Sequence, residues 1–462
     1  MSILIKNGRI ITADQDYTAD IYCEGEQITR IGKHLDAPPN ATVIDASGKY
    51  VFPGFIDPHV HIYLPFMGTF AKDTHETASK AALVGGTTTF IEMICQSKAE
   101  EPLRDGFELW RGKAEGKSAC DFTFHQAVTR FDKKTEGQLT EIVRSGITSF
   151  KVFLAYKGAF GISDEELYHT MRLAKELGVV VTAHCENADA VFELQQKLLG
   201  EGKTGPEWHY WSRPPRVEAE GVHHLLTFAE LHGTQCYIVH TSCEEALQEA
   251  LLAKQRGVPV EVETLIQYLL LDKSYAELPD FEGAKYVMSP PLRDKRNQDI
   301  FWNALRQRFV STVATDHAPF DFVGQKEMGR NDFTKIPNGI PSLEDRVNLL
   351  YTYGVCERRL DLNTFVDCAS TQAARLFGLY PRKGTIVVGA DADVVVYDPQ
   401  YRGTISARTH LLNVDYNAFE GWQVKGRPHV VTVRGEIAVR DGKFVGTVGR
   451  GKLLKRDAHA RA

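Results

Sequence analysis

Eight apolar runs of strand length alternate with amphipathic segments through the middle of this chain of 462 residues, and this alternation constrains the fold most. The runs are VFPGFIDPH, TTTFIEM, DFTFHQAV, ITSFKVFL, VVVTAHCEN, QCYIVHTS, PVEVETL and STVATDHAP. Helical patterns cover 73–85, 135–146, 163–178, 218–233 and 243–257, and several open near Asp or Ser and close on Gly, as capping predicts. Alternating strands and helices are typical of a parallel α/β fold, and eight units predict a (β/α)₈ TIM barrel.

Both ends of the chain differ from the middle. There, short alternating apolar runs are separated by Asn-Gly, Ser-Gly and Asp-Gly turns, a pattern typical of antiparallel strands. We therefore expect residues 1–52 and 376–462 to form one small β domain, with a C-terminal tail, beside a barrel of residues 53–375.

Composition narrows the class of function. The chain is 43% hydrophobic and 25% charged, as in ordinary globular proteins, and its net charge of −6 argues against a nucleic-acid partner. No apolar run reaches membrane-spanning length, and the N-terminus has no signal-peptide core. Eight scattered cysteines without a CxxC pair indicate reduced thiols. We expect a cytoplasmic protein that binds neither nucleic acid nor membrane.

Chemistry in a (β/α)₈ barrel gathers at the C-terminal ends of the strands, where this chain places six polar residues. His59 and His61 end the first run, two positions apart, so their side chains share one face of a strand. The other four residues end later runs: Lys151, His184, His240 and Asp316. Imidazoles suit zinc, and a carboxylate can serve as a ligand and as a proton shuttle.

Lys151 is the unusual member, because an ammonium is a poor metal ligand. It fits a metal site only if its neutral amine adds carbon dioxide and becomes a bridging carbamate. Each rim residue also has a structural interpretation, since a single strand-end histidine is usually an ordinary hydrogen-bonded residue; their joint occurrence favours the metal site. Cys185, Glu186 and His317 flank the expected ligands and are not predicted to be ligands.

The ordered motifs of the chain resemble those of the D-hydantoinase and dihydropyrimidinase family of cyclic amidohydrolases, and most closely the bacterial D-hydantoinases. The motifs are GFIDPHVHI, SFKVFLAYKG, TAHCEN, YIVHTS, MSPPLRDKRNQ, ATDHAPFDF and IPNGIPSLEDR. The resemblance runs nearly end to end. It departs at ETLIQYL, where the family commonly has ETCPQYL, and at Cys185, where alanine is common; neither position carries a ligand.

The resemblance implies a (β/α)₈ barrel with a β-sandwich built from both chain ends, and a binuclear zinc site. In that pattern His59 and His61 hold one Zn²⁺, and His184 and His240 hold the other. Carboxylated Lys151 and a hydroxide bridge the two ions. Asp316 completes the shell of the first ion and shuttles the proton.

The resemblance also implies a substrate site. Tyr156 matches a tyrosine that hydrogen-bonds the developing oxyanion, and Ser289 and Asn338 match positions that bind the cyclic amide, largely through backbone groups. Four apolar residues near the rim could line a pocket for a ring substituent, or else only pack the loops: Leu64, Phe66, Phe153 and Phe160. Tyr63 stands where dihydroorotase-like relatives carry an arginine that holds the substrate carboxylate, which weakens the interpretation of this chain as a dihydroorotase.

The activity implied is zinc-dependent hydrolysis of 5-substituted hydantoins to N-carbamoyl amino acids, with dihydropyrimidines as further substrates. The alternatives are a dihydropyrimidinase that acts mainly on dihydrouracil or dihydrothymine, an allantoinase, and a non-catalytic scaffold like the collapsin response mediator proteins. The full set of ligands argues against the scaffold. Family members are usually homotetramers or dimers, and the basic tail, Arg450 to Arg456, is expected to be either a subunit contact or a solvated end.

Overall fold

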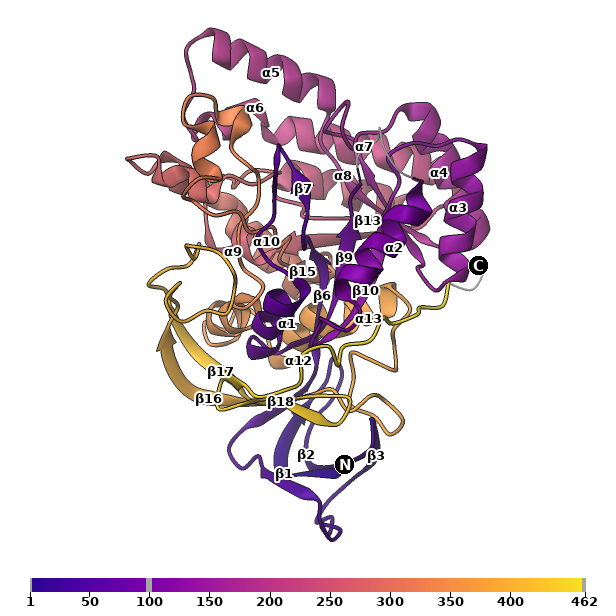
Figure 1. The fold of residues 1–462 in the computed structure, drawn as a ribbon, viewed down its shortest axis with the longest axis vertical. Coiled ribbons are helices and arrows are strands. Elements are labelled where there is room, and N and C mark those ends of the chain that lie inside the picture. The colour runs from indigo at the N-terminus through magenta and orange to yellow at the C-terminus, as the bar shows by residue number, and fades with distance from the viewer. Residues whose placement is uncertain (1, 97–101, 459–462) are drawn as a thin grey trace.

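Eight parallel strands form a barrel in the computed structural model, which describes residues 2–96 and 102–458 (Figure 1). The strands are β6 (Phe55–Val60), β9 (Thr87–Ile94), β10 (Asp121–Ala127), β11 (Ser149–Phe153), β12 (Val180–His184), β13 (Cys236–Ile238), β14 (Val260–Leu265) and β15 (Thr312–Ala314). They are hydrogen-bonded in chain order. A parallel bridge between Val60 and His317 brings the last strand beside the first, so the predicted barrel is confirmed and nearly closed.

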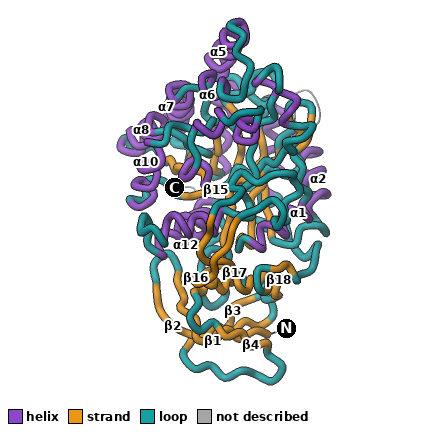
Figure 2. Tube along the Cα trace, turned by 90° about the vertical axis from the view of Figure 1, so that its left-hand side faces the viewer, coloured by secondary structure: helices purple, strands orange, loops and turns teal. Residues whose placement is uncertain are grey.

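Helices cover the outside of the barrel (Figure 2). They are α1 (His75–Val84), α2 (Leu103–Ala114), α3 (Lys133–Arg144), α4 (Asp164–Leu177), α5 (Ala188–Gly200), α6 (Trp208–Ser212), α7 (Pro215–His232), α8 (Glu244–Gln255), α9 (Ile266–Leu270), α10 (Arg296–Arg306), α11 (Arg346–Leu349), α12 (Leu362–Val366) and α13 (Gln372–Leu376). Their ends follow sequence chemistry. At α4, Ser163 and Glu166 form a reciprocal capping box, and Gly178 closes the helix with a left-handed φ of 67°. None of the helices in the described ranges combines the length and the hydropathy that crossing a membrane requires.

Both chain ends build a second unit, as predicted. Its strands are β1 (Ser2–Ile11), β2 (Asp16–Glu24), β3 (Gln27–Gly32), β4 (Thr42–Asp45), β5 (Tyr50–Pro53), β16 (Val394–Thr404), β17 (Gln423–Val433), β18 (Glu436–Arg440) and β19 (Lys443–Phe444). Antiparallel pairing of β16 with β5 joins the two ends into one hydrogen-bonded sheet. β16 to β18 lie between the barrel and β1 to β3 in both views (Figures 1 and 2). Ile3, Ile5, Val394 and Val430 share one buried cluster, so both ends contribute to one core.

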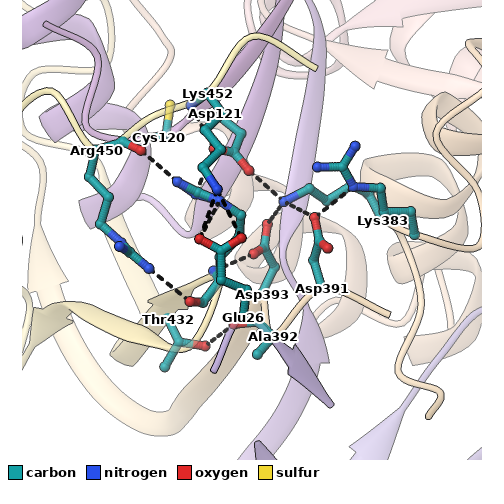
Figure 3. Close-up of polar contacts among 12 residues, drawn as sticks. Glu26, Cys120, Asp121, Lys383, Asp391, Ala392, Asp393, Thr432, Arg450 and Lys452 are labelled. Atoms are coloured by element: carbon teal, nitrogen blue, oxygen red, sulfur yellow. Dashed lines mark hydrogen bonds and ion pairs between the residues drawn. The ribbon is translucent and has the colours of Figure 1, made fainter. Parts of the chain in front are cut away.

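A buried ionic cluster joins this unit to the barrel (Figure 3). Lys383 Nζ lies 2.7 Å from Asp121 Oδ2, at the start of β10, and 2.6 Å from Asp393 Oδ2. Arg434 Nη1 lies 3.2 Å from Asp121 Oδ1. Because all four side chains are buried, their charges are compensated by one another and not by water.

The basic tail belongs to the barrel wall within the chain. We call residues 449–458 the C-terminal strap. Regular pairing of β10 with β11 begins only at Gln126, and the strap lies beside the earlier part of β10. There the Leu454 amide donates to the Phe122 carbonyl over 2.8 Å. Arg456 is buried, and its Nη2 lies 2.8 Å from Ser149 Oγ on β11. In this chain the strap therefore fills a gap between two barrel strands.

Candidate active site

A cavity opens at the C-terminal ends of the barrel strands. Its walls are His61, Leu64, Phe66, Cys95, Lys151, Phe153, Tyr156, Phe160, His184, His240, Ser289, Asp316, Ala318, Asn338 and Gly339. Every residue predicted for the metal and substrate sites therefore lies in this wall, except His59. The His59 side chain is fully buried and contacts the cavity residues His61 and Asp316.

Three of the predicted ligands form a tight cluster. Asp316 Oδ1 lies 3.0 Å from His59 Nε2 and 3.0 Å from His61 Nε2, and the two Nε2 atoms are 3.2 Å apart. Burial opposes charge on His59, but Glu263 and Asp316 outweigh it and raise the pKa of His59 to about 9. Burial alone would raise the pKa of Asp316, yet His59 and His61 hold it well below its usual value. Donor atoms converging in this way fit a bound cation.

The remaining three predicted ligands lie beside this cluster. The ring centroid of His240 is 4.6 Å from that of His184 and 5.4 Å from that of His59. Burial lowers the pKa of His184 and His240 well below the usual value, so both rings are held neutral, the form that binds a metal. Burial also lowers the pKa of Lys151, which favours the neutral amine that can form a carbamate.

Carboxylates behind the histidines fix which ring nitrogen faces the cluster. Glu263 accepts from His59 Nδ1 over 2.7 Å and from the backbone N–H of His240 over 2.7 Å. Glu186 accepts from His184 Nε2 over 2.7 Å and from Arg213, so that Nδ1 is the ring nitrogen of His184 not engaged by Glu186. Such partners orient metal ligands and raise their basicity.

Four residues of this rim have a left-handed backbone conformation, which also occurs at turns elsewhere in the chain. Tyr63, Tyr156, His240 and Asp316 have φ values of 57°, 60°, 41° and 48°. Residues other than glycine adopt such conformations at a free-energy cost of about 1–3 kcal/mol each, so these conformations persist only where the surroundings impose them. The two central members, His240 and Asp316, stand where a strand ends and the chain turns, so the strain coincides with the predicted ligands.

The rest of the cavity wall combines a hydrogen-bonded polar group with apolar aromatic side chains. The Tyr156 hydroxyl is hydrogen-bonded to Ser289 and Asn338, and burial raises its pKa, so it stays a neutral donor. Asn338 Nδ2 donates to Ser289 Oγ over 2.9 Å. The rings of Phe66 and Phe160 stack with centroids 6.1 Å apart. The structure thus brings the predicted oxyanion donor and the predicted apolar residues into one site.

Some residues of the site were not predicted. Cys95 lines the cavity, with its Sγ 4.0 Å from His61 Nδ1. Glu263 carried a signal, because a glutamate inside an apolar strand run must find a buried partner. Of the residues that flank the predicted ligands, His317 pairs with Asp73 over 2.8 Å, and Cys185 packs in the main core.

Comparison with known proteins agrees with this geometry. Residues 50–438 match the model of the amidohydrolase family. The chain is 49% identical over 457 residues to the D-hydantoinase of Geobacillus stearothermophilus, covering 99% of this chain and 97% of the relative. It is 38% identical over 466 residues to the dihydropyrimidinase of Rattus norvegicus, covering 99% and 89%. The solved D-hydantoinase (dihydropyrimidinase) from Thermus sp. superposes with a TM-score of 0.97 at 66% identity, covering 99% of each chain.

Proposed function

This chain belongs to the amidohydrolase family and, within it, to the hydantoinases and dihydropyrimidinases, which hydrolyse cyclic amides; we propose that it opens 5-substituted hydantoins to N-carbamoyl amino acids. The observation that carries the proposal is the cavity itself, where His59, His61 and Asp316 converge beside an apolar wall. A hydrolytic centre next to an apolar pocket suits a ring that carries a bulky substituent.

Amidohydrolases are in general metal-dependent, and the donors of this site fit two zinc ions. His59, His61 and Asp316 would hold one ion, His184 and His240 the other, and Lys151 as N6-carboxylysine would bridge them. When bound, the ions would supply Lewis acidity and lower the pKa of the attacking water toward neutrality. The neutral state of His184 and His240 and the lowered pKa of Lys151 support this assignment.

The protein's own groups then direct the hydrolysis. Tyr156 donates to the ring carbonyl oxygen as negative charge develops there; losing one such donor costs about 10²–10³ in rate. Asp316 uses Oδ1 toward the two histidines, which leaves Oδ2 to take the proton of the attacking water. It passes that proton to the ring nitrogen as the C–N bond breaks, giving an N-carbamoyl group and a carboxylic acid, which loses its remaining proton to the solvent.

A dihydropyrimidinase acting mainly on dihydrouracil is the second candidate, supported by the likeness to the enzyme of Rattus norvegicus. The apolar side chains of Leu64, Phe66, Phe153 and Phe160 favour the hydantoin instead, because dihydrouracil has no substituent to fill that wall. Relative kcat/KM on dihydrouracil and on a 5-aryl hydantoin decides between them, and a preference for dihydrouracil would select the second candidate.

Metal analysis joined to turnover of racemic 5-substituted hydantoins tests the proposal. We expect about two zinc ions per chain, ring opening of the D-enantiomer, and loss of both metal and activity in Lys151→Ala. A purified protein without stoichiometric metal, or full activity in Lys151→Ala, would contradict the assignment of the metal site.

Location and assembly are part of the same proposal. All eight cysteines are free and seven are buried, which suits the reducing cytoplasm. A homotetramer, or a dimer, is the assembly proposed from the family resemblance. Analytical ultracentrifugation measures it directly.

A further inference from the structure

One lysine next to the cavity has only carbonyl oxygens as partners. Lys326 is fully buried, and its Nζ donates to the carbonyls of Val287 over 2.8 Å, Pro337 over 2.6 Å and Gly339 over 2.8 Å. An ammonium carries three N–H donors, so this geometry uses each of them once. Within residues 2–96 and 102–458, its side chain forms no ion pair with a carboxylate of the kind that compensates Lys383.

The three acceptors belong to the two segments that carry the amide-binding residues. Val287 precedes Ser289 by two positions, and Pro337 and Gly339 flank Asn338 on either side. The Gly339 amide also donates to the Val287 carbonyl over 3.0 Å, so the segments meet directly. One buried nitrogen therefore ties together the backbones at 287–289 and 337–339, and Gly339 itself lines the cavity.

The cost of this arrangement indicates a specific role. Burying an ammonium is expensive unless every donor is satisfied, and burial lowers the pKa of Lys326 well below its ordinary value. An apolar side chain would fill the volume at lower cost, but it would remove one donor from each of the three carbonyls, and within the described residues the Val287 carbonyl alone would keep another donor, the Gly339 amide. What the lysine adds is a fixed geometry between two segments, imposed from one atom.

We propose that Lys326 is a positioning residue for amide recognition. Its ammonium holds the 287–289 and 337–339 backbones in the relative position from which they hydrogen-bond the N–H and C=O groups of the substrate ring. This inference rests on the proposed role of Ser289 and Asn338 in binding the cyclic amide. Lys326 contacts neither the cavity nor the predicted metal ligands, so it acts through these two segments.

The test compares a 5-substituted hydantoin with its singly N-methylated analogues in wild type and in Lys326→Met. Methylation removes one ring N–H, so the ratio of kcat/KM for the unmethylated ring to kcat/KM for the methylated ring measures how strongly the site recognises that N–H. We expect wild type to favour the unmethylated ring by about tenfold or more, and Lys326→Met to lose most of this preference, mainly through KM. Zinc content is expected to stay at the wild-type level.

Lys383→Met is the matched control, because it removes another buried ammonium far from the cavity. It is expected to lower stability and keep the wild-type preference. Lys326→Gln, which retains two donors, is expected to lie between wild type and Lys326→Met. If wild type shows no preference, the proposed role of Ser289 and Asn338 fails. If wild type shows it and both Lys326 variants keep it, the positioning role alone is overturned. If neither variant folds, Lys326 serves overall stability and the positioning role is likewise overturned.

Discussion

Glu263 illustrates how one buried carboxylate organises several parts of the candidate site. It accepts from His59 Nδ1, from the His240 backbone and from the Tyr237 hydroxyl, the last over 2.8 Å. One residue of β14 thereby holds two predicted ligands in place, His59 on β6 and His240 just after β13. Its negative charge also raises the pKa of His59.

Glu263→Gln should therefore weaken metal retention while leaving the ligands in place. Loss of such a supporting carboxylate typically costs about 10–100-fold in metal affinity. The measurement is zinc release during titration with a chelator, alongside kcat/KM. Glu261→Gln is the matched control, since Glu261 lies two positions earlier on β14 and pairs with Lys254. Equal zinc affinity in wild type and Glu263→Gln would refute the supporting role.

The six rim residues were predictable because strand ends in a barrel share one edge, and spacing along a strand fixes which side chains share a face. Lys326 was not predictable in this way. Its partners are backbone carbonyls, which every residue carries, so no side-chain pattern marks them. Arg456 was missed for the same reason, since it meets Ser149 and the Phe124 carbonyl.

At the scale of elements, the start of β10 is the point where the two units are locked together. Asp121 opens this strand and pairs with both Lys383 and Arg434. Burial alone would raise the pKa of Asp121, but these two cations hold it below its usual value. The charge of Asp121 is thus part of the contact between β10 and the sheet built from both chain ends.

Asp121→Asn is expected to lower the free energy of unfolding by about 3–5 kcal/mol, because it leaves buried cations without a full partner. Urea denaturation followed by fluorescence measures the change, with turnover at low urea as a check on the site. Asp105→Asn, on the exposed first turn of α2, is the control and should stay within about 0.5 kcal/mol of wild type. If Asp121→Asn lowered the free energy of unfolding as little as the control does, the ion pairs of Asp121 with Lys383 and Arg434 would contribute little to stability.

A second element is sensitive to pH. Asp345, just before α11, accepts from Asn417 Nδ2 over 2.8 Å, and burial raises its pKa from 3.8 to about 6. The folded state then binds this proton more tightly than the unfolded chain does. The contribution is full below pH 4 and is lost as pH rises to about 6.

We therefore expect the stability of wild type relative to Asp345→Asn to fall across this window, by on the order of 2–3 kcal/mol. Unfolding by urea at pH values from about 4 to about 7.5 measures the difference. A difference that does not vary with pH would contradict a raised pKa at Asp345.

The elements were predicted unevenly. The five helical patterns correspond to α1, α3, α4, α7 and α8, whose periodicity and caps are clear in the sequence. α2, α5 and α10 were not among them. The basic charges of the strap led us to expect a subunit contact or a solvated end. The subunit contact stays a prediction, and within the chain the buried Leu454 and Arg456 fill a gap in the barrel wall, which was not predicted. Such a gap depends on the register of β10 and β11, which local sequence does not reveal.

At the scale of the whole molecule, the strap connects the C-terminus to the strands that carry the site. Arg456 Nη2 meets Ser149 Oγ, which lies 2.6 Å from His125 Nδ1, and His125 Nε2 lies 3.0 Å from the Pro58 carbonyl. Ser149 precedes Lys151 by two positions on β11, and Pro58 directly precedes His59 on β6. The strap is therefore linked by hydrogen bonds to the fourth, third and first barrel strands.

Ending the chain after Val448 should weaken this hydrogen-bonded brace as well as the fold. Loss of Leu454 burial alone is expected to lower the free energy of unfolding by about 2–5 kcal/mol. If the brace reaches the site, zinc should also leave the shortened protein faster in the presence of a chelator, without denaturant, where the protein remains folded.

Arg456→Met isolates the contact with Ser149, and Lys455→Ala, which removes an exposed charge of the same strap, is the control. Faster zinc release in Arg456→Met with unchanged release in Lys455→Ala is the expected result. If zinc left both variants at the wild-type rate, the strap would stabilise the barrel wall and have no effect on the site.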